Sequence, residues 1–196
     1  MARWEPNARE RLVRAALDLF TEQGYDATTV TGIADRAGLT KTTFFRHFPD
    51  KREVLFAGQD THARLLADAI TEAPGPATPL QAVGAALDAI TATFTDDRRE
   101  FSARVRSVTA GHSELQERAA LKRAGLARAM SDALHHRGVT EPTASLAAEL
   151  GVRAFYDAFD RWADPAGQAD PADHRTLTEL ARHTLDELHA AAAALR

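Results

Sequence analysis

Apolar residues recur every three or four positions along almost the whole chain, and no segment alternates apolar and polar residues as a half-buried strand does. This period places side chains on one face of an α-helix. The sequence therefore predicts an all-α fold. Helices are expected, between breaks marked mainly by glycine and proline, over about residues 8–23, 29–37, 40–48, 50–73, 80–94, 101–108, 113–137, 143–162 and 173–195.

Two of the short helices flank a single glycine, Gly38. Two short helices joined by a tight turn that contains glycine are typical of a helix-turn-helix, whose second helix enters the major groove of DNA. Ile33 and Ala34 of the first helix and Phe44 and Phe48 of the second supply the facing apolar contacts. The second helix then exposes donors and methyl groups suited to bases and phosphates: Thr40, Lys41, Thr42, Thr43, Arg46 and His47.

The distribution of charge favours the same kind of partner. The whole chain has a formal net charge of −4, but residues 36–52 contain five cations and one anion, Asp50. A local positive field on an otherwise acidic chain attracts phosphate groups. The segment is therefore predicted to bind double-stranded DNA.

The segment "ALDLFTEQGYDATTVTGIADRAGLTKTTFFRHFPDKREVLF" contains four motifs, namely Leu-Phe-x-x-x-Gly-Tyr, Ile-Ala-x-x-Ala-Gly, Thr-x-x-x-Phe-x-x-His-Phe and x-x-Lys-x-x-x-Leu. Together, over about residues 9–56, they resemble the N-terminal DNA-binding domain of the TetR (tetracycline repressor) family of bacterial transcription regulators. The resemblance implies a three-helix helix-turn-helix domain over residues 1–52 and a helical effector-binding and dimerisation domain over residues 53–196. It also implies a homodimeric repressor that binds a pseudo-palindromic operator and is released by an unidentified small-molecule effector.

The resemblance assigns DNA contacts to particular residues. Thr29 and Thr31 match positions that touch phosphates, although the hydroxyls of Thr29 and Thr40 are equally suited to capping helices. Arg46 is a candidate DNA contact, and the alternative is that its side chain is solvent-exposed or forms an ion pair within the protein. Positions that match contacts to bases or the adjoining sugars are Lys41, Thr42 and Thr43.

Two further positions match phosphate anchors, His47 and Lys51. Lys51 also stands at the predicted start of a helix, where exposed N–H groups attract anions. The family usually has tyrosine where this chain has Phe45. Because a phenyl ring has no hydroxyl to donate, Phe45 is expected to make van der Waals contact with the sugar backbone.

The helix expected over residues 143–162 is apolar on two sides. Leu146 and Leu150 fall on one arc, whereas Phe155 and Phe159 belong to another. A helix of this kind is buried between layers or packs against a second subunit. We therefore expect a homodimer through the last two helices, which would place two recognition helices about 34–36 Å apart on DNA.

The predicted effector site rests on the resemblance and on an aromatic pattern. Aromatic residues at helical spacing either line an apolar pocket or form ordinary core, and a nearby arginine either recognises a polar group or is exposed. The helix over residues 50–73, continuous from Lys51, is the expected link between effector and DNA. Candidate ligand-binding residues are Phe94, Phe101, Arg104, Phe155, Tyr156, Phe159 and Trp162.

Several function classes lack their usual signatures. The chain has no cysteine, no glycine-rich phosphate loop, no His-Glu-x-x-His pair and no Gly-x-Ser-x-Gly sequence. We therefore expect neither an enzyme nor a cofactor or metal site. No signal-peptide core and no apolar run of about 18 residues occurs, so a cytoplasmic location without membrane contact is expected. The alternative function is a DNA-binding regulator without a small-molecule ligand, constitutive or controlled by a protein partner.

Overall fold

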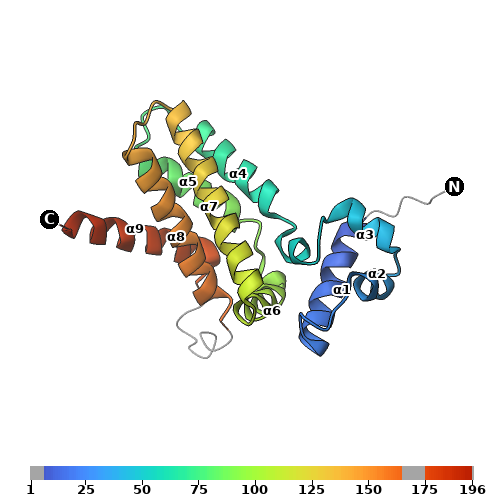
Figure 1. Ribbon diagram of the computed structural model, residues 1–196. Coiled ribbons are helices and arrows are strands. Elements are labelled where there is room, and N and C mark those ends of the chain that lie inside the picture. Colours follow the sequence, from blue (N-terminus) through green and yellow to red (C-terminus); the bar gives the residue numbers. More distant parts are fainter. Residues whose placement is uncertain (1–6, 165–174, 196) are drawn as a thin grey trace. The chain divides into compact units, whose positions relative to one another are not determined.

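The computed structural model describes residues 7–164 and 175–195 (Figure 1). Every regular element in these ranges is a helix, so the predicted all-α fold is confirmed. None of the described helices is both long enough and apolar enough to span a membrane. The last helix, α9, spans Leu177–Ala194, and residues 173–174 of its predicted start lie outside the described residues.

The chain divides into two compact units. The first contains the residues up to Ala57 together with Arg104–Ala120, and the second contains Gly58–Ala103 together with the residues from Leu121 onwards. Two helices, α6 (Arg99–Ala110) and α7 (Ser113–His136), therefore contribute residues to both units.

The first unit is built from α1 (Ala8–Gln23), α2 (Val30–Arg36), α3 (Lys41–His47) and a 3₁₀ helix η1 (Arg52–Phe56). These helices bury one apolar core, in which Leu12, Ile33 and Phe44 are inaccessible to solvent. Leu115, from the start of α7, joins this core and is equally buried. The predicted inward residues of the helix-turn-helix are thus confirmed as core.

Side-chain caps fix where α2 and α3 begin. The Thr29 hydroxyl accepts a hydrogen bond from the backbone N–H of Gly32 at 3.0 Å, and that of Thr40 accepts one from Thr43 at 3.1 Å. Such a cap satisfies a donor that the helix leaves without an internal partner. Gly38 has a φ of +65°, a left-handed conformation that is strained for residues with a side chain. This conformation turns the chain between α2 and α3.

The prediction of one continuous helix over residues 50–73 is wrong. The structure has the short η1, a turn at Ala57 and Gly58, and then α4 (Gln59–Glu72). Asp50 Oδ1 accepts hydrogen bonds from the backbone N–H groups of Arg52 at 2.8 Å and Glu53 at 3.1 Å, and so starts η1 as a separate element. Glycine is a poor helix former, and the boundary between the units falls directly before Gly58.

The second unit packs α5 (Pro79–Thr91) against α4, α8 (Thr143–Trp162) and α9, with a short 3₁₀ helix η2 (Asp96–Arg98) after α5. Small residues let the helices approach closely. A Cβ added at Gly151 of α8 would lie 2.5 Å from Val83 Cγ1 and 2.8 Å from Met130 Cε. Because both neighbours are buried, a larger residue there would displace the core.

Candidate nucleic-acid interface and aromatic cluster

The helix α3 separates buried aromatic residues from exposed polar ones. Phe44 and Phe48 are buried, whereas Lys41 and Thr42 are exposed. Phe45, one residue beyond Phe44, points outward with 49% of its surface exposed. Its ring centroid lies 5.9 Å from Lys41 Nζ, so a cation and an exposed aromatic ring share the outer face.

The threonines at the starts of α2 and α3 are tied to the backbone yet accessible. Thr29, Thr31 and Thr40 are exposed, although the hydroxyls of Thr29 and Thr40 cap their helices. The hydroxyls of Thr40 and Thr43 also lie 3.0 Å apart within hydrogen-bonding distance. A hydroxyl that accepts from the helix still has a proton to donate to a phosphate oxygen.

Lys51 is directed towards the backbone of its own unit. Its Nζ donates to the carbonyl oxygens of Tyr25 at 2.7 Å and Thr28 at 3.0 Å, and it lies 4.0 Å from the Tyr25 ring centroid. Burial lowers the pKa of Lys51. The expected exposed N–H groups beside it are partly occupied, since those of Arg52 and Glu53 already donate to Asp50. Lys51 therefore stabilises the turn between α1 and α2.

His47 is half-buried at the end of α3. Its Nε2 is shielded from solvent and has no hydrogen-bond partner among the described residues. Burial lowers the pKa of His47, and the positive charges of Arg46 and Arg9 lower it further. The imidazole therefore favours its neutral form and can offer a single N–H donor.

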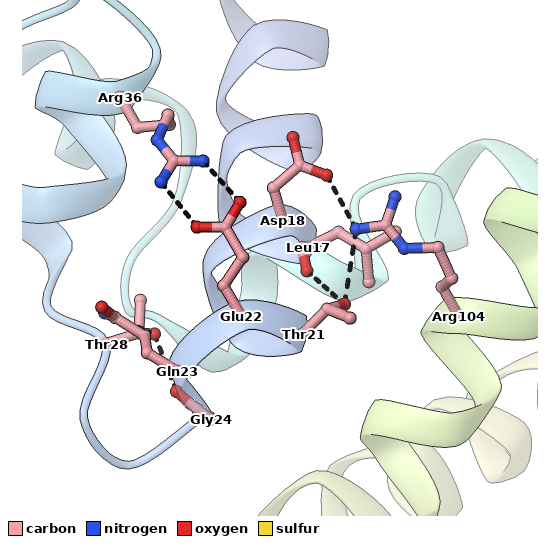
Figure 2. Close-up of polar contacts among 9 residues, drawn as sticks. All are labelled: Leu17, Asp18, Thr21, Glu22, Gln23, Gly24, Thr28, Arg36 and Arg104. Carbon is pink, nitrogen blue, oxygen red and sulfur yellow. Dashed lines mark hydrogen bonds and ion pairs between the residues drawn. The ribbon is translucent and has the colours of Figure 1, made fainter.

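The end of α1 holds the first unit together through polar contacts (Figure 2). Glu22 accepts two hydrogen bonds from Arg36 of α2, at 3.0 and 2.7 Å, and Asp18 accepts one from Arg104 Nη2 of α6 at 2.7 Å. Arg104 had been a candidate ligand-binding residue. The structure instead places its guanidinium in an ion pair of the first unit.

Four of the other candidates meet in the second unit. Phe94, which follows α5, lies with its ring centroid 5.7 Å from that of Phe155, 5.5 Å from Phe159 and 6.3 Å from Trp162. We call these four residues the aromatic cluster. The candidate Tyr156 touches its edge, 5.2 Å from Phe155, whereas Phe101 forms none of these ring contacts.

Polar groups border the aromatic cluster, and the sequence pattern did not single them out. The side chain of Gln59 forms a hydrogen bond with Tyr156, but its Oε1 atom is shielded from solvent without a hydrogen-bond partner among the described residues. The same holds for Nε of Arg99. The Arg99 guanidinium lies 5.1 Å from the Trp162 ring centroid, and the Arg123 guanidinium lies 4.0 Å from that of Tyr156. Buried polar atoms without partners are rare and indicate a missing contact.

The histidine at this border is His62, whose ring centroid lies 5.5 Å from that of Phe94. Burial, followed by the nearby charge of Arg98, lowers the pKa of His62. Burial likewise raises the pKa of Tyr156. Both side chains are therefore neutral near pH 7 and offer hydrogen-bonding groups without charge.

Apolar residues are also exposed on the last two helices. Leu146 of α8 exposes 56% of its surface, and Leu195, directly after α9, exposes 88%. The other side of α8 is buried, with Ala148 and Phe155 in the core of the second unit. Of the first apolar arc, Leu146 is exposed whereas Leu150 is half-buried against the core.

Comparison with known proteins agrees with the helix-turn-helix. Residues 12–57 match the family described as bacterial regulatory proteins, tetR family. The regulator TcmR of Streptomyces glaucescens is 37% identical over 92 residues, which cover 47% of this chain and 41% of TcmR. The match thus spans less than half of that relative. Residues 12–57 are therefore similar to the DNA-binding region of the tetR family of bacterial regulatory proteins.

Solved structures are similar over nearly the whole chain. A TetR-family regulator from Syntrophomonas wolfei has a TM-score of 0.63 with 16% identity, and the match covers 97% of both chains. FadR of Thermus thermophilus, a transcriptional repressor in complex with lauroyl-CoA, has a TM-score of 0.50 with 21% identity and 91% of both chains covered. At these identities the similarity establishes the fold of both units.

Proposed function

We propose that this protein is a transcriptional regulator that binds double-stranded DNA with α3 in the major groove. The observation that carries the proposal is the division of α3 into a buried face and an exposed one. Phe44 and Phe48 fix the helix in the core, while Lys41, Thr42 and Phe45 remain free to meet a duplex. The match of residues 12–57 to the tetR family supports the same function.

Within this proposal the exposed residues divide by chemistry. Lys41 donates to base-edge acceptors, and the Thr42 methyl packs against apolar parts of bases. Phe45 contacts the sugar backbone. Thr43 contacts a base or the adjoining sugar. Phosphate contacts come from Thr29, Thr31, Thr40, Arg46 and His47. Two protons of the Lys51 ammonium group are donated to backbone carbonyls, which leaves one for a phosphate.

The proposed regulator acts as a homodimer in the cytoplasm. The exposed leucines Leu146 of α8 and Leu195, directly after α9, support a partner surface there, because covering them with a second copy removes apolar surface from water. A two-fold axis there places two copies of α3 on successive turns of the major groove and requires a pseudo-palindromic operator.

The aromatic cluster is the proposed effector site. Gln59 Oε1 lacks a donor and Arg99 Nε–H lacks an acceptor beside four aromatic rings, which suits a flat apolar molecule that carries one hydrogen-bond donor and one acceptor. The lauroyl-CoA complex of FadR supports a small-molecule ligand in this fold. Effector binding lowers operator affinity and relieves repression; a 100-fold loss requires about 2.7 kcal/mol of coupling.

Since residues 50–73 are not one helix, α6 is the proposed coupling element. It supplies Arg99 to the contact with Trp162 in the second unit and Arg104 to the ion pair with Asp18 in the first. An effector that displaces Arg99 therefore acts on α6, the helix whose Arg104 forms the ion pair with Asp18 of α1. No step in this proposal uses catalysis, a metal or a cofactor.

The DNA proposal is tested by selecting bound sequences from a random duplex pool and measuring their affinity for the purified protein. We expect a pseudo-palindrome with half-sites about one helical turn apart. A protein that binds no duplex of any sequence at low ionic strength contradicts the proposal. Substitution of Lys41 by methionine is the matched loss-of-contact variant.

The effector proposal is tested with indole and N-methylindole, which have almost the same shape but differ in one N–H donor. We expect indole, at high concentration, to raise the thermal unfolding temperature more than N-methylindole does, and the difference to vanish in a Gln59→Leu variant. Equal shifts with both probes contradict the donor requirement. A chain that responds to neither, yet binds DNA, favours a regulator without a small-molecule ligand.

A further inference from the structure

Three side chains with nitrogen donors gather where the end of α3 meets the start of α1. Arg9 of α1 places its guanidinium carbon 5.5 Å from the centroid of the Phe48 ring. The His47 ring lies 6.4 Å from the same phenyl ring. Arg46, the residue before His47, acts electrostatically on that imidazole, as Arg9 does. We call Arg9, Arg46 and His47 the cationic cluster.

No anion neutralises this cluster within the described chain. Arg9 and Arg46 are exposed, and neither forms an ion pair or a side-chain hydrogen bond with another described residue. Other arginines of the first unit differ: Arg14 pairs with Glu10 at 2.9 Å, and Arg36 pairs with Glu22. Like charges held together without a counterion repel, so the cluster gains from binding an anion.

His47 gives an independent indication of a missing partner. Its Nε2 is shielded without a hydrogen bond, and its other ring nitrogen, Nδ1, also has no hydrogen-bond partner in the described chain. Since a neutral imidazole carries one N–H, a proton on Nδ1 provides a donor that can reach a group arriving from outside. The packing against Phe48 holds Arg9 and His47 on the same ring.

We propose that Arg9, with Arg46 and His47, binds a phosphate of the DNA backbone next to the bases that α3 contacts. The proposal rests on the proposed DNA binding and adds a residue of α1 to it. The cluster lies at the end of α3, whereas Lys41 and Thr42 lie at its start. A cation on α1 that contacts the backbone fixes the orientation of the protein without selecting a base sequence.

The contact has a specific thermodynamic signature. Each neutralised phosphate releases condensed counterions, so the logarithm of the binding constant falls with the logarithm of salt concentration, with a slope of about −0.9 per contact. We therefore expect Arg9→Ala to reduce the size of this slope by about 0.9 and to weaken binding at low salt by roughly similar factors on all DNA sequences. Arg9→Lys should keep most of the slope.

The experiment measures fluorescence anisotropy of the full chain on a selected duplex over a series of salt concentrations. Arg14→Ala is the matched control, because it removes the same charge from another exposed side chain of α1, but from a residue already paired with Glu10. We expect Arg14→Ala to follow the wild type. Arg9→Gln, which keeps the length of the side chain against Phe48, is measured in parallel in case Arg9→Ala unfolds.

The outcomes separate this inference from the proposed function. If the wild type binds no duplex, DNA binding itself is wrong. If the wild type binds but Arg9→Ala, Arg9→Gln and Arg14→Ala all show its slope, the phosphate contact of Arg9 is overturned. A changed base preference in the Arg9 variants, with an unchanged slope, also overturns it, because that result assigns Arg9 to a base.

Discussion

The two units present their aromatic residues in opposite ways. In the first unit, Phe44 and Phe48 are structural, and the groups proposed to contact DNA are the cations and hydroxyls on the surface around them. In the second unit the aromatic rings themselves form the candidate site, and the polar atoms at Gln59 and Arg99 lie buried beside them. A surface that meets DNA is visible in the sequence as charge, whereas an internal site is hidden among core residues.

The largest expected effect contrasts two neighbouring rings of α3. Phe44→Ala removes a fully buried ring and should cost about 3–5 kcal/mol of unfolding free energy, whereas Phe45→Ala should change stability by about 0.5 kcal/mol or less. Thermal unfolding followed by circular dichroism checks both values. Phe45→Ala should instead weaken DNA binding. Equal losses of stability would show that α3 is not anchored as described.

Two lysines provide the next contrast. Lys51→Met removes hydrogen bonds to two carbonyl groups and should reduce stability by about 1.5–3 kcal/mol. Lys41→Met should leave stability unchanged but weaken binding to the selected operator by about 1–3 kcal/mol, a factor of about 5 to 150. Denaturant titration and anisotropy separate the two effects. A Lys51→Met variant of normal stability that binds DNA poorly would restore Lys51 as a phosphate anchor.

The second unit should respond differently to loss of a polar group. Gln59→Leu removes a buried acceptor that has no partner but also the hydrogen bond between the Gln59 side chain and Tyr156, so the two effects should nearly cancel and change stability by less than about 1 kcal/mol. The same change should abolish the preference for indole over N-methylindole and leave DNA affinity in the absence of ligand unaltered. Calorimetric unfolding tests the first expectation. A loss of more than about 1 kcal/mol would mean that the hydrogen bond to Tyr156 outweighs the removal of the partnerless acceptor.

The smallest expected effect is on the pH dependence of stability. Burial lowers the pKa of His62, so the unfolded chain takes up a proton first, and the contribution of His62 to stability falls as pH drops below about 6.5. The hydrogen bond to Glu141 raises the pKa of His135, whose contribution is present in acid and lost as pH rises through the folded pKa. In a plot of unfolding free energy against pH, His62→Gln should reduce the loss of stability towards acid pH. His135→Gln should reduce the loss of stability that occurs as pH rises through the folded pKa of His135.

The sequence predicted much of the first unit because its determinants are local. Thr29, Gly38 and Thr40 set the helix boundaries through neighbours within a few residues, and the structure confirms each boundary. The helix over residues 50–73 was predicted wrongly because its apolar period continues through Gly58, although Asp50, which accepts from the first N–H groups of η1, stands directly before it. The family match agrees with this division, since it ends at residue 57.

The long-range contacts decided the rest. Arg104 pairs with Asp18, Arg9 packs on Phe48 and Lys51 bonds the carbonyl of Tyr25, and no periodicity in the sequence indicates these partners. Gln59 likewise gave no signal, because a single glutamine at the start of a helix is usually solvated. By itself the sequence determined helix positions, caps and the exposed cationic face of α3, since these depend on neighbouring residues. Only tertiary packing decided which polar atoms are paired or left without a partner, because that depends on residues distant in the chain.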